Sequence, residues 1–520
     1  MTLLKQTDLI LFSINDIREI ETKVAAENPG KSLMKKAGKA TAALAKKLIE
    51  NNVHPVLIVA GPGNNGGGAC AAAADLAKDG YQVIVVLCAD PATYSEGGKK
   101  YFEKALSRKV IFKNSNSLTS LLKQDFSLII DGLFGIGLHR PIAGIEKEVV
   151  LHINDYAKET HVPVLSIDVP SGLNADTGAI VRSETEEGVC VKADYTITFL
   201  GNKLGLHTAD GKDYAGTVII SDLDVEPTAQ TDRSPKLNAP ASFHFTLPRR
   251  NHNSHKGNFG QVAIIGGAKG MVGASILAGR TALFAGAGKV TIGFLSQAPS
   301  FDILHPEIMC HDADQMTMRY DVIVIGPGLG TSEAAKLLLS DALRSNASLV
   351  IDADALNLIS MDESLQDALR HRNAASVLTP HPLEAARLLQ ESTETIQSNR
   401  PQHGLALAKK FNATVILKGS GSIICDQQGQ LRVNTSGNAG LATGGTGDVL
   451  AGLCGALLGQ GLSAFDAAQL ATWLHGQAAD DLLKKGNGPV GMSPSELPFA
   501  IRHCLNNLIK HNGKYASHQL

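Results

Sequence analysis

Short apolar runs alternate with helical patterns along most of the chain. In the first part these runs are VLIVA (56–60), YQVIVVLCA (81–89), SLIID (127–131), VPVLSID (162–168), DYTITF (194–199) and GTVIIS (216–221). They are β-branched and apolar on both faces, which is typical of parallel strands buried between helices. A helical stretch, broken at ENPGK (27–31), precedes them. Strands that alternate with helices predict a doubly wound α/β sheet.

The second part repeats this rhythm with different loops. Its runs are GQVAIIGG (260–267), KVTIGF (289–294), DVIVIG (321–326), SLVID (348–352), SVLTP (376–380) and TVILKG (414–419), followed by Ala/Leu/Gly-rich helices over 444–485. Between the parts, EPTAQTDRSPKLNAP (226–240) is rich in Pro, Thr, Ser and charge and lacks apolar periodicity, which indicates a linker. The pattern therefore predicts two α/β domains, 1–225 and 241–520.

Composition narrows the class of protein. The 520 residues carry a formal net charge of −2, so nothing indicates a nucleic-acid or anionic-membrane partner. The seven cysteines are scattered without a CxxC pair, which is typical of reduced thiols. The N-terminus lacks the apolar core of a signal peptide, and no apolar run reaches the roughly 20 residues that span a bilayer. We expect a cytoplasmic protein that acts on small molecules.

The sequence GPGNNGGG (61–68) joins a strand to a helix and predicts an anion-binding turn. Backbone N–H groups at a helix N-terminus favour an anion, and glycines let a ligand approach closely. The spelling fits neither the dinucleotide fingerprint nor the Walker A loop. Asn64 and Asn65 add amide groups, whose oxygens could bind a hard cation. A tight turn without a ligand is the alternative.

Acidic and hydroxyl side chains follow two further predicted strands of the first part. Asp131 ends one strand, and Asp168 ends another with Ser171 shortly after it. Because ligands of open α/β sheets bind at the carboxyl ends of the strands, these side chains should meet the Asn64–Asn65 turn at one edge. Each aspartate could instead be a helix cap or a turn former. Lys192, before the next strand, could reach the same rim or be a solvated lysine.

The most informative stretch of the second part is GNAGLATGGTGDVLAG (437–452). The N–H groups of Gly445, Thr446 and Gly447 would form an anion hole at the start of a helix. Asp448 could take a proton from a hydroxyl group that attacks a phosphoryl group held there. The pattern indicates phosphoryl transfer to an alcohol, and a capped helix start of small residues is the alternative.

Other strand ends of the second part carry supporting motifs. Lys418 and the small residues that follow leave room for a flat ring or phosphates, although a plain hairpin is a rival interpretation. His381 stands between two prolines, which fix its backbone, or it is incidental to a rigid connector. Further strand ends carry the glycine turns GGAKGMVGAS (266–275) and GPGLG (326–330) and the pair Asp352 and Asp354.

Together these motifs resemble a known pair of enzymes. The first part resembles the YjeF-type, Rossmann-like NAD(P)H-hydrate epimerase domain through 64–67, 131–141, 166–172 and 192–199. The second resembles the ribokinase-like ADP/ATP-dependent NAD(P)H-hydrate dehydratase through 255–292, 326–330, 352–357, 381, 418–422 and 437–452. The fusion is similar to the bifunctional repair enzyme family, which acts on hydrated NADH and NADPH (NADHX and NADPHX).

The resemblance implies two activities. The first domain would interconvert the R and S hydrates, and the second would dehydrate the S hydrate at the expense of ADP, giving AMP and phosphate. It also implies K⁺ in the first domain, Mg²⁺ with ADP in the second and a homo-oligomer, a tetramer or higher.

In the first domain the matching K⁺ ligands are Asn65, Asp131 and Ser171, with Asp168 and Lys192 as acid/base residues. The matching hydrate-binding residues are Asn64, Asn65, Gly66, Gly67, Gly68, Gly135, Ile136, Gly137, Leu138, His139, Arg140, Pro141 and Asp168.

In the second domain the resemblance implies phosphorylation of the added hydroxyl group and then loss of phosphate. Asp448 would be the base, and Gly445, Thr446 and Gly447 the anion hole. The residues matching the hydrate site are Ala274, Gly328, Gly330, His381 and Asp448, and those matching the ADP/AMP site are Lys418, Gly419, Ser420, Gly421, Ser422 and Gly447.

One departure and two rival hypotheses bear on this prediction. The family usually has Asp-Gly after NNGG, where this chain has Gly68-Ala69, so a carboxylate that would contact the substrate or loop amides is missing. One rival is a ribokinase-like kinase for a vitamin precursor, fused to a nucleotide-binding domain. In the other, the first domain is a scaffold without activity. The retained Asn65, Asp131, Asp168 and Ser171 argue against a scaffold.

Overall fold

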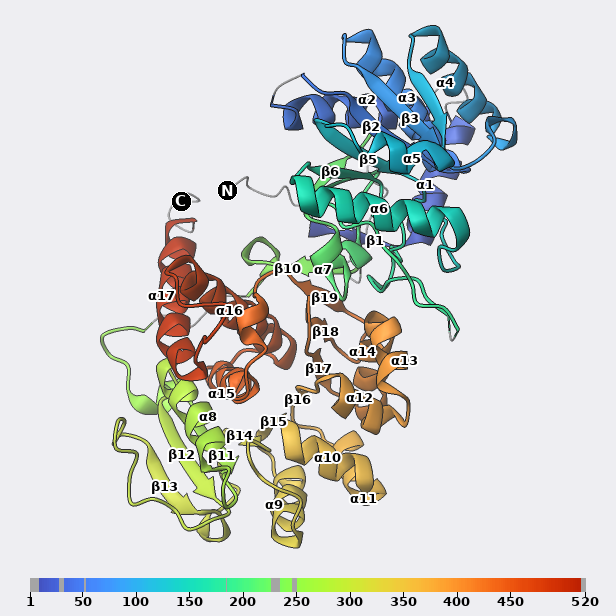
Figure 1. Cartoon of the computed structure of the whole chain (residues 1–520). Coiled ribbons are helices and arrows are strands. Elements are labelled where there is room, and N and C mark those ends of the chain that lie inside the picture. The colour runs from blue at the N-terminus through green and yellow to red at the C-terminus, as the bar shows by residue number, and fades with distance from the viewer. Residues whose placement is uncertain are drawn as a thin grey trace. The chain divides into compact units, whose positions relative to one another are not determined.

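The computed structural model describes residues 9–27, 32–50, 53–183, 185–225, 234–245 and 250–515. The chain forms two compact units, Met1–Pro235 and Lys236–Leu520, and each is an α/β unit (Figure 1). Both contain a largely parallel sheet with helices on its two faces, so the predicted fold class is confirmed.

The boundary of the second unit differs from the predicted linker. Residues 226–233 lie outside the described residues, but Lys236–Asn238 form strand β10, which pairs with β19 (Leu431–Asn434) in the second sheet. The interpretation of 236–238 as linker is therefore wrong. The sequence pattern did not predict this short edge strand, because three residues are too few to show periodicity. The strand with which it pairs also lies almost 200 positions later in the chain.

The first unit is built on a seven-stranded sheet in the order β4-β3-β2-β5-β6-β7-β9, with all pairs parallel. The strands are β2 (Val56–Ala60), β3 (Val83–Leu87), β4 (Ile111–Asn114), β5 (Leu128–Gly132), β6 (Val164–Ile167), β7 (Tyr195–Phe199) and β9 (Thr217–Ser221). The helices are α1 (Ile14–Glu27), α2 (Leu33–Leu48), α3 (Asn64–Lys78), α4 (Glu96–Ser107), α5 (Leu118–Leu121), α6 (Gly144–Thr160) and α7 (Gly211–Tyr214).

Alternate side chains of β2 show why both faces of this sheet are apolar. Val56, Ile58 and Ala60 pack in the core beneath α2, α3 and α4, whereas Leu57 and Val59 pack against α5 and α6. Chain order reverses between β2 and β5, so the loops after these two strands leave the sheet in opposite directions. Such a switch point opens a crevice at the carboxyl edge.

A second, two-stranded sheet closes this unit. Leu11–Phe12 (β1) pairs in parallel with Asn202–Lys203 (β8). The pair ties the N-terminal segment to the chain just after β7, and it fixes the backbone of Lys203.

The second unit has a ten-stranded sheet in the order β10-β19-β18-β17-β16-β15-β14-β11-β12-β13, in which β18 is antiparallel to both neighbours. Its other strands are β11 (Gln261–Gly266), β12 (Lys289–Phe294), β13 (Met309–Asp312), β14 (Val322–Ile325), β15 (Ser348–Ile351), β16 (Ser376–Leu378), β17 (Thr414–Leu417) and β18 (Ile423–Cys425). The helices are α8 (Val272–Phe284), α9 (Glu333–Arg344), α10 (Ala353–Met361), α11 (Glu363–Arg370), α12 (Pro382–Leu389), α13 (Thr393–Ser398), α14 (Arg400–Phe411), α15 (Thr446–Gly459), α16 (Ala464–Lys484) and α17 (Leu497–Tyr515).

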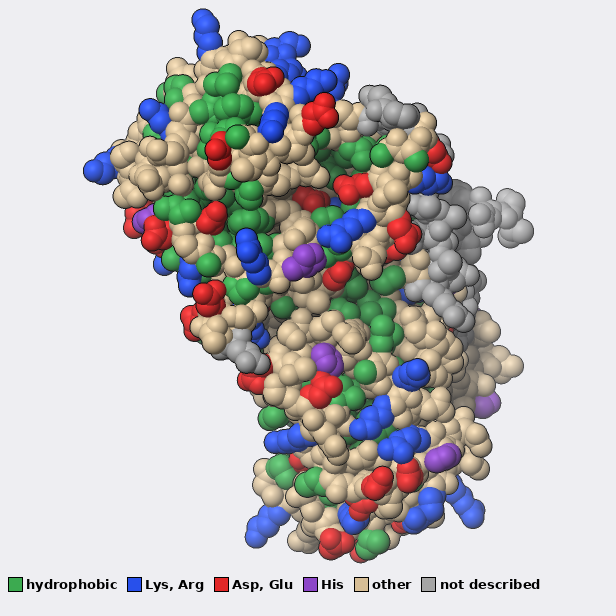
Figure 2. All heavy atoms as spheres, turned by 90° about the vertical axis from the view of Figure 1, so that its right-hand side faces the viewer, with side chains coloured by type: hydrophobic (Ala, Val, Ile, Leu, Met, Phe, Trp, Pro, Cys, Tyr) green, Lys and Arg blue, Asp and Glu red, His purple; other side chains and the backbone are tan. Residues whose placement is uncertain are grey.

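The surface carries both signs of charge. On the face drawn in Figure 2, acidic and basic side chains are interspersed, and neither sign gathers into a large patch. Among the described helices, none is both long enough and apolar enough to cross a membrane. All seven cysteines are free.

Candidate functional site

The first unit holds a cavity of about 590 Å³ at the carboxyl edge of its sheet, a size that suits a small ligand. The cavity lining includes residues that the sequence motifs predicted as well as others that they did not. The predicted ones are Asn64, Asn65, Gly68, Gly135, Ile136, Gly137, Leu138 and Asp168. The other predicted residues do not belong to this lining: His139 and Arg140 are exposed, and Gly66, Gly67 and Pro141 also lie outside it.

The glycines of the first turn serve close packing as well as ligand access. Residues 64–68 are not a loop but the first residues of α3, with Gly63 as its N-cap. A Cβ on Gly66 would lie 1.9 Å from the Gly61 carbonyl oxygen, and one on Gly67 would lie 2.8 Å from the Met34 sulfur. Gly68 differs, because a Cβ there would meet nothing within 4 Å.

This difference predicts opposite effects of two alanine substitutions. Gly68→Ala should raise the free energy of unfolding of the first unit by about 0.5–1 kcal/mol, because alanine is the better helix former and the space is open. Gly66→Ala is the matched control and should destabilise the unit, because its methyl group overlaps backbone. Thermal unfolding of both variants measures this. Equal destabilisation by the two substitutions would contradict the open space at Gly68.

Asp131 lies at the end of β5 and is fully buried in a hydrogen-bond network. Its Oδ1 accepts from the Ser171 hydroxyl (2.6 Å) and the Leu133 amide (3.2 Å). Its Oδ2 accepts from the Ser166 hydroxyl (2.8 Å) and the Ser171 amide (2.9 Å). Burial raises the pKa of Asp131, and these hydrogen bonds oppose the shift. The network joins the loops after β5 and β6 beside the cavity.

The predicted potassium ligands are brought together only in part. Asp131 and Ser171 contact each other, whereas the Asn65 amide donates to the Ile167 carbonyl (3.3 Å). The Ser171 hydroxyl also lies 3.1 Å from the Phe134 carbonyl, so its proton can turn there and free an Asp131 oxygen. These oxygen donors therefore fit a hard monovalent cation. Within the described part of the chain, no three His, Cys, Asp or Glu side chains form a metal-binding group.

Asp168 lines the cavity and forms an ion pair with a buried lysine. It follows β6 with a left-handed backbone (φ 70°), a conformation that is costly for a residue other than glycine. Its Oδ1 accepts a hydrogen bond from the Lys203 ammonium at 2.8 Å, and Lys203 is itself fully buried. The Lys203 ammonium also donates to the Phe199 carbonyl. The pair presents a carboxylate with a fixed cation behind it to the cavity.

Lys192 does not lie at this rim, so that expectation is wrong. Lys192 is exposed and precedes β7, which runs parallel to β6, so it lies at the amino end of the sheet. Lys203 occupies the position that the sequence interpretation gave to Lys192. The available signal was a lysine between apolar residues in FLGNKLGL (199–206), where a solvated lysine is not expected.

In the second unit, the predicted GTGD turn is the N-terminus of α15. Gly445 is the N-cap with φ 100°, and Asp448 lies in the first turn. The Thr446 amide donates to the Thr443 carbonyl at 3.4 Å. No described group accepts a hydrogen bond from the Gly445 or Gly447 amides.

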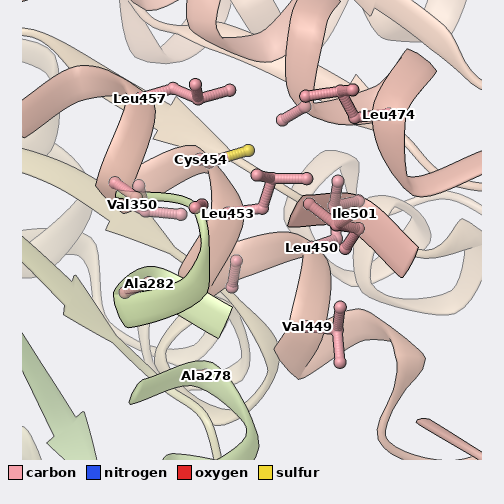
Figure 3. Packing of buried hydrophobic residues seen from close by; sticks show 14 of the residues in the cluster. Ala278, Ala282, Val350, Val449, Leu450, Leu453, Cys454, Leu457, Leu474 and Ile501 are labelled. Carbon is pink, nitrogen blue, oxygen red and sulfur yellow. The ribbon is translucent and has the colours of Figure 1, made fainter. Parts of the chain in front are cut away.

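The helix behind this turn is held rigidly. Eleven of its fourteen residues are buried. Figure 3 shows Val449, Leu450, Leu453 and Leu457 of α15 packed among side chains of α8, α16 and α17. A helix buried on all sides keeps the turn at its N-terminus in place. Asp480 of α16 adds a polar tie, because its two oxygens accept from the Gly437 amide and the Asn438 side chain, both at 2.9 Å.

A charged cluster faces the start of α15. Lys418, after β17, donates to Asp352 Oδ1 at 2.8 Å, and Asp352 also accepts from the Thr379 hydroxyl at 2.7 Å. A Cβ on Gly447 would lie 3.3 Å from the Lys418 ammonium, so this cation lies beside the first turn of α15. Burial alone would lower the pKa of Lys418, but Asp352 and Glu384 raise it, and the group stays charged.

Asp448 has a carboxyl group with an unusually high pKa. Burial raises its pKa to about 7, the charge of Asp352 adds to the rise, and Lys418 opposes it. Such a carboxylate accepts a proton more readily than an ordinary aspartate does, and a pKa near the working pH suits general base catalysis.

His381 is held as the N-cap of α12. Its Nδ1 accepts from the Leu383 amide (3.1 Å) and the Glu384 amide (3.3 Å), so the proton of the neutral ring is on Nε2. Nε2 lies 3.3 Å from Glu384 Oε1. Burial and Lys418 lower the pKa of His381, whereas burial raises that of Glu384 to about 7. The side chain stays 46% exposed beside the charged cluster.

The predicted glycine turns of this unit also converge. A Cβ on Gly328 would lie 3.2 Å from the Ala274 methyl group, so these two predicted hydrate-binding residues are neighbours. The Gly330 amide donates to Asp354 Oδ2 at 2.8 Å. Residues 418–422 form the tight turn between β17 and β18, as predicted.

Comparisons with known proteins find matches to both units. The family model for the YjeF-related protein N-terminus matches residues 30–205, and the NAD(P)H-hydrate dehydratase model matches 262–502. The chain is 34% identical over 486 residues to the bifunctional NAD(P)H-hydrate repair enzyme Nnr of Escherichia coli (strain K12), covering 91% of this chain and 89% of that one. The chain belongs to the bifunctional NAD(P)H-hydrate repair enzyme family.

Other relatives in this repair enzyme family match the whole chain or its second unit. The Nnr enzyme of Coxiella burnetii is 33% identical over 515 residues, 96% of this chain and 99% of that one. The ADP-dependent (S)-NAD(P)H-hydrate dehydratase of Neisseria meningitidis serogroup B is 39% identical over 284 residues, 54% of this chain and 96% of that one. The Bacillus subtilis ADP/ATP-dependent dehydratase co-crystallised with ATP/Mg²⁺ has a TM-score of 0.44 and 26% identity, covering 51% of this chain and 95% of that one.

Proposed function

We propose that this chain epimerises R and S NAD(P)HX in its first unit and dehydrates the S hydrate in its second at the expense of ADP. The observation that carries the proposal is the second unit's cluster, in which the Lys418 ammonium lies beside Gly447 and interacts with Asp448 at the start of α15, whose Gly445 and Gly447 amides have no described acceptor. A base, a fixed cation and free N–H groups are what phosphoryl transfer to an alcohol requires.

In the dehydratase site, Asp448 takes the proton of the hydroxyl group that hydration added. The hydroxyl oxygen attacks the terminal phosphorus of ADP, and AMP leaves. The Gly445 and Gly447 amides and the Lys418 ammonium hold the charge that develops on the phosphoryl oxygens. Phosphate then leaves the ring together with a proton from the neighbouring carbon, which restores NAD(P)H. Asp352 keeps Lys418 in place, and Ala274, Gly328, Gly330 and His381 would contact the hydrate.

The nucleotide would lie against 418–422, where Gly419, Ser420, Gly421 and Ser422 form a turn without bulky side chains. Mg²⁺ with ADP would neutralise phosphate charge. We assign this ion no protein ligands.

In the epimerase site, Asp168 acts on the hydrated ring with Lys203 as its fixed partner. Asn64, Asn65 and 135–138 would contact the dinucleotide at the N-terminus of α3, where an anion is favoured. K⁺ would be held by Asn65, Asp131 and Ser171 and would counter substrate charge. The free cysteines support the cytoplasmic location, and the homo-oligomer stays a prediction.

One incubation tests both activities. The protein receives mixed R and S NADHX plus ADP, and NADH absorbance and free phosphate are followed. Full recovery of NADH with one phosphate for each NADH supports both activities. Recovery that stops at the S fraction, beyond the uncatalysed rate, would show an inactive epimerase. A stable phosphorylated product in place of NADH would favour the kinase hypothesis instead.

The pKa of Asp448 gives a pH prediction for the dehydratase. Its base form is lost as the pH falls through about 7, so kcat/KM for S-NADHX should drop on the acid side and level off above that value. Glu384 has a similar pKa, so Glu384→Gln is the control and should keep the acid limb. A wild-type profile that is flat across pH 7 would contradict Asp448 as the base.

A further inference from the structure

Helix α1 forms one wall of the epimerase cavity, although it precedes the residues 30–205 that the family model matches. Ile17, Arg18 and Glu21 contribute to the cavity lining. The sequence motifs assign none of these residues a role.

Helix α1 is held firmly in this position. The Ile14 amide donates to Asp176 Oδ1 at 2.8 Å, and the Ser13 and Asp16 side chains bond each other's amides at the helix start. Ile17, Ile20 and Val24 are buried in the same apolar core as Phe199 and Leu200 beside Lys203. The wall that presents Glu21 is therefore a fixed part of the cavity.

Glu21 faces the Asp168–Lys203 pair. The Glu21 side chain remains exposed to solvent at the cavity, and its partial desolvation there raises its pKa; the negative charge of Asp168 adds to the rise, and Lys203 and Arg18 oppose it. Asp168 has its own ion pair, whereas no described cation lies within ion-pair distance of Glu21. The cavity lining thus holds two carboxyl groups in unequal surroundings: Asp168 is paired with the Lys203 ammonium, whereas Glu21 has no such partner and a raised pKa. Such pairs are how one site divides acid and base roles.

We propose that Glu21 is a second catalytic residue of the epimerase, which exchanges a proton with the hydroxyl group of the hydrated ring. The proposal rests on the epimerase function proposed above. In one turnover the Glu21 carboxyl group donates its proton to the hydroxyl group as the carbon–oxygen bond breaks, which leaves water and a ring cation. Water then adds to the other face of that carbon, and the Asp168 carboxylate takes its proton.

The step balances without a further reagent. One carbon–oxygen bond breaks and one forms, nothing is oxidised or reduced, and one proton moves from Glu21 to Asp168. That proton returns to Glu21 through water in the cavity before the next turnover. In the reverse direction the same two groups exchange roles.

The test measures conversion of pure R-NADHX with ADP, in which an excess of a separately prepared Asp168→Asn chain supplies dehydration of the S product. The uncatalysed rate is subtracted. For Glu21→Gln we expect kcat to fall at least about 100-fold with little change in KM, as for loss of a general acid. Glu19→Gln is the matched control, because Glu19 is exposed on the same helix, as Glu21 is, but it lies outside the cavity lining.

A pH profile separates catalysis from a merely structural role. Wild-type kcat should fall on the alkaline side as Glu21 loses its proton, and Glu21→Gln should lack that limb. The charged groups that face Glu21 are Arg18 on its own helix, Asp168 after β6 and Lys203 on β8. Glu21→Asp should keep the limb with an intermediate kcat, which provides a reading even if the glutamine variant folds poorly.

The outcomes are distinct. Equal kcat values for Glu21→Gln and Glu19→Gln, or an effect on KM alone, would overturn the role of Glu21 and leave the epimerase function standing. A wild-type chain that does not accelerate R-NADHX conversion would overturn both proposals.

Discussion

Asp448→Asn is expected to lower kcat for dehydration of S-NADHX by about 10²–10⁴-fold, the usual contribution of a positioned general base. Asparagine keeps the shape of the side chain but cannot accept the hydroxyl proton, and it leaves Lys418 its partner Asp352. The α15 core is untouched, so the fold should persist. The measurement is NADH recovery from pure S-NADHX with saturating ADP.

Two controls accompany this variant. Asp341→Asn removes an exposed carboxylate that pairs with Arg344 on α9 and should leave kcat unchanged. Conversion of R to S hydrate by the Asp448→Asn chain should also be unchanged, because the epimerase cavity belongs to the other unit. Dehydration at the wild-type rate would exclude Asp448 as the base.

Asp168→Asn should have a comparably large effect on the other activity. We expect R-NADHX conversion to fall by about 10²–10⁴-fold, because the acid/base group is lost, while dehydration of S-NADHX stays at the wild-type rate. The first unit should also lose stability, by about 3–5 kcal/mol, because the buried Lys203 ammonium is left without its carboxylate.

A double variant separates these two consequences. Adding Lys203→Met to Asp168→Asn removes the unpaired charge and should restore much of the free energy of unfolding without restoring epimerisation. Chemical denaturation and R-NADHX turnover measure the two effects on the same chains. An equal loss of activity on the S hydrate, or recovery of epimerisation in the double variant, would rule out the assigned role of Asp168.

In both candidate sites, the residues at the ends of buried strands or at a glycine turn could be predicted from the sequence. Asp131, Asp168 and Asp448 follow from runs that are apolar on both faces and from a glycine turn that opens a helix. The prediction for Lys192 was wrong because apolar periodicity locates a strand but does not show at which edge of the sheet a flanking residue lies; Lys192 precedes β7 and so lies at the amino end. Lys203 was missed because its position depends on β1 and β8, strands of two residues each that carry no pattern.

Long-range pairing explains the other omissions. Glu21 lies on an amphipathic helix whose polar residues are usually solvated, and only the tertiary structure turns this one toward Asp168. The mutual hydrogen bonding of Asp131 and Ser171 was likewise not visible, because it depends on how closely the loops after β5 and β6 approach each other. Residues that complete a site from a distant segment leave no local signature.

The burial of eleven of the fourteen residues of α15 has a consequence for how this enzyme can vary. Because α15 also belongs to the core of the second unit, a mutation that changes the size of that core should disturb the turn at the start of the helix. Heat-sensitive alleles should therefore arise at positions such as Leu453 and Leu457, far from any substrate atom. Adaptation to a new growth temperature would have to proceed through the outer helices instead.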